Sequence, residues 1–237
     1  MASTNTLART INYAQQYLDQ SPLTFTTPVV SNDPAFYHAD WVMQMILAPP
    51  FAWRWNRSAG SFSTPTFTTQ IGLTDYKVNI PTFGWIEKAV VYDPSNGNAP
   101  MELMVEGVRG LDPVSNEPNR ISAQYDDGAG NITFRVFPAP QMVYNVIVDY
   151  QNAASIFTSA TQPWAPLPDY MSYLYNTGFL AKSMEYWNDP RYQMLMQLFL
   201  QQLISASEGL SETYKNIWLD DKMNYVRQSM AVQQGKR

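Results

Sequence analysis

Hydrophobic residues near the start of the chain recur every three or four positions, at Leu7, Ile11, Ala14 and Leu18. This spacing predicts a helix over about residues 4–18 with one apolar face. A second helix is predicted over about 34–47, because Asp33 can cap its first turn and Pro34 suits the first helical position. Pro49-Pro50 ends this helix, since proline disfavours helical geometry in the residue before it.

The hydrophobic period changes from 3.6 to two between residue 51 and about residue 150, which predicts β-strands. In Asn131–Phe137 apolar and polar residues alternate strictly, as in an antiparallel strand with one face in a core. Turn signals at short intervals indicate a small antiparallel sandwich or barrel. The predicted strands are Phe51–Arg57, Thr66–Ile71, Tyr76–Ile80, Trp85–Tyr92, Met101–Val108, Arg120–Tyr125, Asn131–Phe137 and Val143–Tyr150.

Helical patterns return after residue 151, with helices predicted over about 169–187, 190–207 and 211–232. The helix from Arg191 is apolar over most of its circumference, so we expect it at the centre of a bundle or shared with a neighbouring subunit. The predicted fold is α+β. Residues 1–50 and 151–237 form a helical bundle domain, and residues 51–150 form an inserted antiparallel β-sandwich or barrel.

The composition favours a subunit of an oligomer over a simple monomer. Charged residues make up 15% of the chain, against about 25% in typical soluble domains. Subunit interfaces are enriched in aromatic residues and Met, and this chain has 12 Met, 15 Tyr and 7 Trp. An aromatic-rich core is the alternative explanation. The candidate interface residues are Trp41, Trp53, Trp55, Trp164, Tyr170, Met194, Met196 and Arg227.

The net charge of −5 and the absence of a basic stripe exclude tight non-specific binding of nucleic acid through its phosphates. The chain has no cysteine, which excludes disulfides, thiolate catalysis and Cys-based zinc sites. No stretch reaches the roughly 18 apolar residues of a membrane span. The first twenty residues do not resemble a signal peptide. We therefore expect a protein made in the cytoplasm that does not associate with membranes.

The sequence predicts no catalytic residue, metal ligand or cofactor site. A hydrolase would have to use His38, the only histidine, as its base. No Gly-x-Ser-x-Gly motif accompanies it, and we expect His38 at a surface or interface. Asp126-Asp127 lies at a predicted turn, where Asp is common for backbone reasons. Asp220-Asp221 is expected on a solvated helix face.

Phe51, Trp53 and Trp55 alternate on the first predicted strand. Such a row has two interpretations. Together with Trp85, the two tryptophans could form an aromatic face that recognises glycan, making the β module a binding module. Alternatively, the row closes the junction between the helices and the β module.

Two segments resemble predicted virion proteins of tailed bacteriophages. The first is DWVMQMILAPPFAWRWNR at residues 40–57, and the second is WAPLPDYMSYLYNTGFLAK at residues 164–182. Together with the helix that follows Asp189-Pro190, they cover most of the helical part of the chain. The layout of a helical bundle with a β insertion is similar to that of phage head-to-tail adaptors, including the tail tubular protein A type.

This resemblance implies a structural protein of the virion neck, assembled in the host cytoplasm. About a dozen copies, a dodecamer in such a family, would form a closed ring. The implied partners are the portal protein, a tail or nozzle protein, and genomic DNA that passes without specific binding. Asp220 and Asp221 are candidate channel-facing acids, and a basic C-terminal tail with Arg227, Lys236 and Arg237 is expected to order on the portal. A tail-tube, baseplate or capsid-decorating subunit is the alternative within structural proteins.

Overall fold

The chain has a mixed α+β fold in a computed structural model. The structure describes residues 4–18, 34–94, 97, 99–106, 116–207, 210 and 212–234, without the side chains of residues 18, 212 and 225–234. It divides into two compact units. One comprises Met1–Trp55 and Ala154–Arg237, and the other comprises Asn56–Ala153. The first contains the helices and the second contains the strands, so they are called the helical unit and the β unit.

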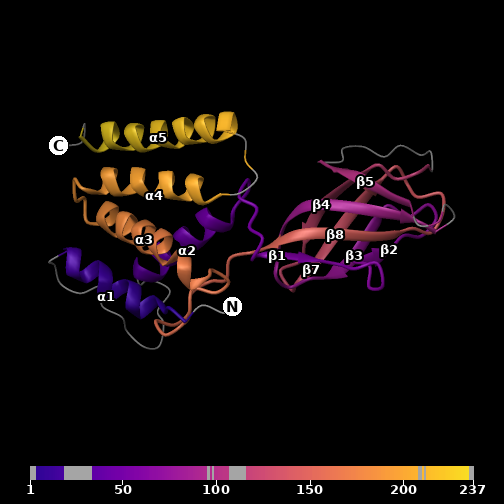
Figure 1. The fold of residues 1–237 in the computed structure, drawn as a ribbon, viewed down its shortest axis with the longest axis horizontal. Helices are drawn as coiled ribbons and strands as arrows, with labels where there is room; N and C mark the ends of the chain where they lie inside the picture. The colour runs from indigo at the N-terminus through magenta and orange to yellow at the C-terminus, as the bar shows by residue number, and fades with distance from the viewer. Residues whose placement is uncertain are drawn as a thin grey trace. The chain divides into compact units, whose positions relative to one another are not determined.

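The helical unit contains the helices that the hydrophobic spacing predicts. They are α1 (Leu7–Leu18), α2 (Pro34–Leu47), α3 (Ser172–Tyr186), α4 (Tyr192–Ala206) and α5 (Glu212–Gln234), and a 3-10 turn, η2 (Asp169–Met171), precedes α3. Helix α3 contacts α1, α2 and α4, while α5 contacts α4 (Figure 1). Among the described residues, no helix is both long and apolar enough to span a lipid bilayer.

Large aromatic side chains fill the core of the helical unit. Gly178 of α3 lies against the ring of Phe199 from α4, and a Cβ added at this glycine would stand 2.8 Å from a ring carbon. The absence of a side chain at Gly178 therefore allows α3 and α4 to pack closely. The largest fully buried side chains of this core include Phe51, Trp164, Tyr175, Phe179 and Phe199.

Helix α4 contacts both α3 and α5, but its side chains are not covered on all sides. It buries Phe199, Leu200 and Leu203 but exposes Met194 and Leu198 on another face. Its exposed face is apolar or amide in character, since the sequence of α4 contains no charged residue. Whether a neighbouring subunit covers this face stays a prediction.

The β unit is a curled mixed sheet (Figure 1). Its strand order is β1-β8-β4-β5-β6-β7-β3, and β2 also pairs with β8. Along β7, Ile132, Phe134 and Val136 are buried, which confirms the predicted alternation. The strands are β1 (Arg57–Ala59), β2 (Phe67–Thr68), β3 (Asp75–Asn79), β4 (Phe83–Asp93), β5 (Ala99–Val105), β6 (Arg120–Asp126), β7 (Asn131–Phe137) and β8 (Asn145–Asn152).

Two strand predictions are wrong. Residues 51–56 form no strand, and pairing begins only at Arg57, opposite Gln151. The sheet is also not purely antiparallel, because β5 and β6 pair in parallel through Met104↔Arg120 and Val105↔Ile121. Parallel neighbours need a crossover rather than a tight hairpin, and the long segment between Val105 and Arg120 provides the length for one.

The two ends of the β unit are joined by hydrogen bonds. Asn56 Nδ2 donates to the Asn152 carbonyl oxygen at 2.9 Å, and Asn152 Nδ2 donates to the Asn56 carbonyl oxygen at 2.6 Å. The Asn152 amide N–H also donates to the Asn56 carbonyl oxygen at 3.2 Å. The chain therefore leaves the β unit beside the point at which it enters.

Candidate functional site: an aromatic pocket of the helical unit

A cavity of about 310 Å³ lies in the helical unit near the start of α3 and the end of α4. This volume is at the lower end of the range for ligand-binding pockets. The side chains around it come from three segments that are distant in sequence. We call it the aromatic pocket, and it is lined by Ala52, Trp53, Arg54, Trp55, Tyr170, Met171, Tyr173 and Ala206.

One wall of the aromatic pocket is the segment 51–55, which ends in a turn and whose alternate rings stack in a row. The ring centroids of Phe51 and Trp53 are 6.3 Å apart, and those of Trp53 and Trp55 are 5.5 Å apart. The indole N–H of Trp53 donates to the Ile46 carbonyl oxygen at 2.7 Å, and this ring is buried. Trp55 is only half-buried. Stacking on the buried ring of Trp53 therefore holds the half-buried ring of Trp55 in place.

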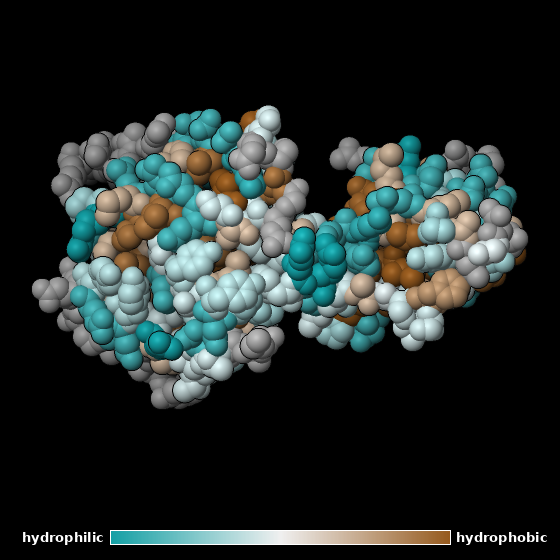
Figure 2. All heavy atoms as spheres, in the orientation of Figure 1, coloured by the Kyte–Doolittle hydropathy of each residue, from teal (hydrophilic) through white to brown (hydrophobic). Residues whose placement is uncertain are grey.

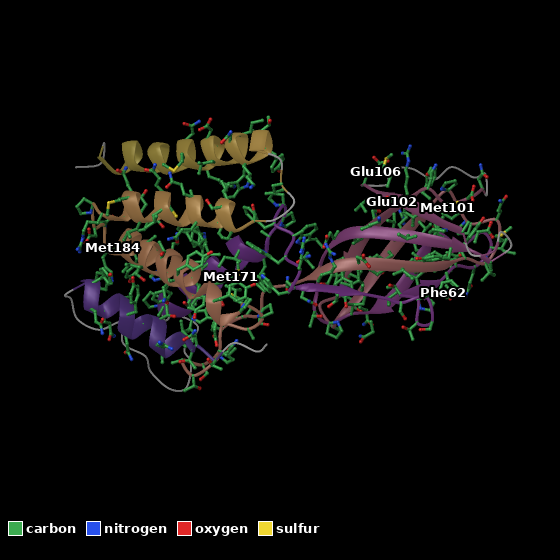
Figure 3. The ribbon with its side chains drawn as sticks, in the orientation of Figure 1. Phe62, Met101, Glu102, Glu106, Met171 and Met184 are labelled. Atoms are coloured by element: carbon green, nitrogen blue, oxygen red, sulfur yellow. The ribbon has the colours of Figure 1, made fainter. Side chains whose placement is uncertain are left out.

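The other wall comes from the start of α3, marked by Met171 in Figure 3. Tyr170 is 70% exposed and Tyr173 is 44% exposed, while Met171 is buried. This region is held in place by the neighbouring Asp169, whose carboxylate accepts hydrogen bonds from the backbone N–H groups of Thr4 and Asn5 at 3.0–3.2 Å. The exposed phenol rings of Tyr170 and Tyr173 therefore belong to a segment that the hydrogen bonds of Asp169 hold in place.

Among the described residues that line the aromatic pocket, Arg54 is the only charged one, and none carries a carboxylate or an imidazole. General acid–base chemistry requires a titratable pair within hydrogen-bonding reach of a reacting group. The lining offers ring faces, phenol groups and one guanidinium instead. These groups suit contact with another molecule, because Trp, Tyr and Arg supply most of the binding energy at protein interfaces.

Three predicted interface residues are buried in the chain itself, although one of them, Trp53, also lines the aromatic pocket. Trp164, Met196 and Trp53 are buried in the core of the helical unit. Trp164 stacks on Tyr175 with ring centroids 4.5 Å apart and donates its indole N–H to Thr10 Oγ1 at 2.9 Å. Composition could not separate core aromatics from surface aromatics, because both enrich the sequence in the same residues.

The other predicted interface residues have different surroundings. Trp55, Tyr170 and Met194 keep exposed surface. Trp41 is half-buried, and its ring lies 4.9 Å from Lys182 Nζ in a cation–π contact. The side chain of Arg227 and the tail residues Lys236 and Arg237 lie outside the described residues. Asp220 and Asp221 are exposed on α5.

The pocket brings together residues that sequence reasoning did not combine. Trp53 and Trp55 belong to the helical unit, whereas Trp85 belongs to β4 of the β unit, so these three tryptophans do not belong to one β module. Tyr173, Arg54 and Ala206 were missed as partners of Trp55. The only signal for Tyr173 is its spacing of three from Tyr170, which places both on one side of a helix start.

His38 is buried rather than on a surface, which corrects the prediction. Its Nδ1 lies 3.2 Å from Ser183 Oγ, and Ser183 Oγ donates to the Phe179 carbonyl oxygen at 2.8 Å. Nδ1–H must therefore donate to Ser183. Burial, and then the positive charge of Lys182, lower the pKa of His38 to about 4. Because Ser183 is fully buried, this pair has no access to substrate and serves packing.

The burial of His38 predicts a specific loss of stability in mild acid. The pKa in the unfolded chain is near 6.5, so the unfolded state binds the proton first as the pH falls. The free energy of unfolding should therefore decrease by about 2 kcal/mol between pH 7 and pH 5. Urea unfolding at several pH values measures this decrease. In His38→Gln the decrease should largely vanish, and an equal decrease in both proteins would contradict the assignment.

The acidic pairs lie where the sequence predicts them, Asp126-Asp127 at a turn and Asp220-Asp221 on an exposed helix face. Asp127 Oδ1 accepts hydrogen bonds from the backbone N–H groups of Ala129 and Asn131 in the turn between β6 and β7. The Lys77 ammonium, followed by these hydrogen bonds, lowers the pKa of the Asp127 carboxyl. Within the described residues, no group of three or more His, Asp or Glu side chains could hold a metal ion.

Comparisons with known proteins do not assign the site. Neither the protein-family models nor the curated proteins include a match to this chain.

Proposed function

We propose that this chain is a structural protein of a tailed-phage virion without catalytic function. It forms a ring of about a dozen subunits that joins the portal to the tail, and the genome passes through the ring. The observation that carries this proposal is the surface of the helical unit. Large apolar and aromatic side chains are exposed there beside a pocket whose described lining is mainly apolar and aromatic, with Arg54 as the one charged residue among the described ones.

The exposed apolar side chains of the helical unit support assembly with other subunits. Figure 2 shows hydrophobic side chains over α4 and α5, where Met194, Leu198 and Ile217 are exposed. The absence of charge from α4 adds to this support, because the centres of interfaces are depleted in charged residues. A closed ring would bury such a surface through one contact repeated around the ring.

The proposal also includes a finer description of the fold. The N- and C-terminal helices would form a bundle that carries the β unit as a barrel-like insertion, the layout to which phage adaptors are similar. The net charge of −5 is compatible with a channel that does not retain DNA, since acidic side chains repel phosphate. Asp220 and Asp221 are the channel-facing acids in this proposal.

The number of copies per virion tests the proposal. Quantitative mass spectrometry of purified virions, calibrated against the major capsid protein, should give about a dozen copies, as a single closed ring requires. Hundreds of copies would instead indicate a tail-tube or capsid-decorating subunit. The absence of the chain from virions would overturn the structural role itself.

A further inference from the structure

A small polar pocket lies between the first turns of α1 and α3, two helices of the helical unit that pack together (Figure 1). Its volume is about 100 Å³, well above the space that a single water molecule needs. Every described residue of its lining carries a polar side-chain group, whereas pockets for drug-sized ligands are mainly apolar. We call it the polar pocket, and it is lined by Asn5, Arg9, Thr10, Ser172, Tyr175 and Asn176.

Two side-chain atoms of the residues that line the polar pocket are buried without a hydrogen-bond partner. They are the Tyr175 hydroxyl oxygen and Asn176 Oδ1, and among the described residues only four buried side-chain atoms are in this state. Tyr175 is 1% exposed, so bulk solvent does not reach its hydroxyl freely. An unpaired polar group is costly in a protein interior, and a molecule in the polar pocket that pairs both atoms would remove this cost.

The groups around the two unpaired atoms are held in place by contacts inside the helical unit. The ring of Tyr175 stacks on Trp164 with ring centroids 4.5 Å apart, which fixes the direction of its hydroxyl. Arg9 Nη1 donates to Asn5 Oδ1 at 2.6 Å, and Asn5 Nδ2 donates to Asp169 Oδ1 at 2.9 Å. The polar pocket is therefore preorganised, and a ligand would have few side chains to order on binding.

The charges around the polar pocket favour an uncharged ligand. Burial, and then the negative charge of Asp169, raise the pKa of Tyr175 to about 12, whereas the positive charge of Arg9 and a weak contact with the Asn5 side chain lower it. Asp169 and Arg9 thus act in opposite directions on a group that lines the pocket. Asp169 would repel an anion bound there, and Arg9 would repel a cation.

We propose that the polar pocket binds a small uncharged polyol through two neighbouring hydroxyl groups. Asn176 Oδ1 can only accept a hydrogen bond, and the Arg9 guanidinium can only donate one, so the ligand must do both within a small volume. A hydroxyl donates and accepts from a single atom. The hydroxyls of Tyr175 and Ser172 can take either role and suit the second hydroxyl of a vicinal diol.

The diol can belong to a free polyol such as glycerol or to the edge of a sugar ring. Both present the same pair of hydroxyl groups and little apolar surface, as the lining requires. This inference goes beyond the proposed function and does not depend on it, because the polar pocket is formed within the helical unit of one chain.

Saturation-transfer difference NMR on the full-length protein tests this binding, with glycerol and methyl α-glucopyranoside as probes. Irradiation of the protein should transfer saturation to the C–H protons of at least one probe. The expected Kd is in the millimolar range, as a ligand of few atoms allows. Propan-1-ol is the matched control, because it has the carbon chain of glycerol but a single hydroxyl, and it should receive no saturation.

Two variants remove the unpaired atoms one at a time. Tyr175→Phe keeps the ring on Trp164 and removes only the hydroxyl, while Asn176→Leu removes the amide at similar size. Each should raise the Kd about tenfold, the effect of losing one hydrogen bond to the ligand. Tyr186→Phe removes an exposed hydroxyl at the other end of α3 and should leave the Kd unchanged. Circular dichroism confirms that each variant is folded.

Each outcome decides the inference. Saturation of glycerol identifies a free polyol as a ligand, saturation of the glycoside identifies a sugar, and either supports the diol site when the two variants weaken it. Saturation of neither probe, or equal saturation of propan-1-ol, overturns the diol site and leaves water as the occupant of the polar pocket. An unchanged Kd in either folded variant places the binding elsewhere and overturns the inference as well. The copy number in virions has no bearing on these results, so the proposed function stands or falls separately.

Discussion

Replacing Trp164 with Ala should destabilise the helical unit by about 3–5 kcal/mol, the range for truncating a large buried aromatic side chain. The Trp164 ring is completely buried, stacks on Tyr175 and meets Phe157 edge-on with ring centroids 4.8 Å apart. Its indole N–H donates to Thr10 Oγ1, which ties α1 to the segment before α3. Removing it therefore leaves a cavity and an unsatisfied hydroxyl between these elements.

Urea unfolding followed by the helical circular-dichroism signal measures this loss. Trp164→Phe keeps a ring on Tyr175 but removes the hydrogen bond to Thr10 together with part of the indole ring system. It should cost about 1–3 kcal/mol. Trp187→Ala, which truncates an exposed ring, should change the stability of the monomer much less. A loss below 1 kcal/mol in Trp164→Ala would contradict the described core.

Replacing Gly178 with Val should destabilise the helical unit by about 3 kcal/mol, at the upper end of the usual cost of overpacking. The first added carbon would already lie 2.8 Å from Phe199 Cε2 and 2.9 Å from Phe199 Cδ2. Phe199 is fully buried and also meets the ring of Trp41, so its ring cannot move aside freely. The gain in helix propensity over glycine is at most about 1 kcal/mol and does not compensate.

The matched control for Gly178→Val is Thr177→Val, a substitution of similar shape at the neighbouring, half-buried position of α3. Equilibrium unfolding of both variants should show a small effect for the control. Combining Gly178→Val with Phe199→Leu should cost less than the sum of the two single losses, because the smaller side chain relieves the clash. If the two losses in the free energy of unfolding simply add, then the contact between Gly178 and Phe199 does not limit how closely α3 and α4 pack.

The helices were predictable because their signals are local. Asp33-Pro34 and Pro49-Pro50 bound α2 in the sequence, and the structure places α2 at Pro34–Leu47. The buried face of α2 was not predictable in the same way. Most positions of α2 are apolar, so spacing alone does not select one face, and His38 lies on the buried one. Which side of such a helix is covered depends on contacts with distant segments such as α3.

The aromatic pocket could be predicted only in part. The alternation of Phe51, Trp53 and Trp55 is real, since their rings stack in order, but it does not come from a paired strand. Alternating side chains indicate a strand only where the backbone is extended and paired. Residues 54–56 form a turn instead. The opposite wall, with Tyr170 and Tyr173, joins the pocket through the tertiary fold, which leaves no trace in local spacing.

The hydrogen bonds between Asn56 and Asn152 hold the two ends of the β unit side by side, so the β unit is an insertion that another domain could replace. The chain enters and leaves the β unit at neighbouring points. A different domain with adjacent ends could therefore replace the β unit without displacing Trp55 or Ala154 of the helical unit. Natural selection could therefore vary the β unit rapidly while the helical unit, which carries the aromatic pocket, changed slowly. Related chains would then share their helices and differ in the module between them.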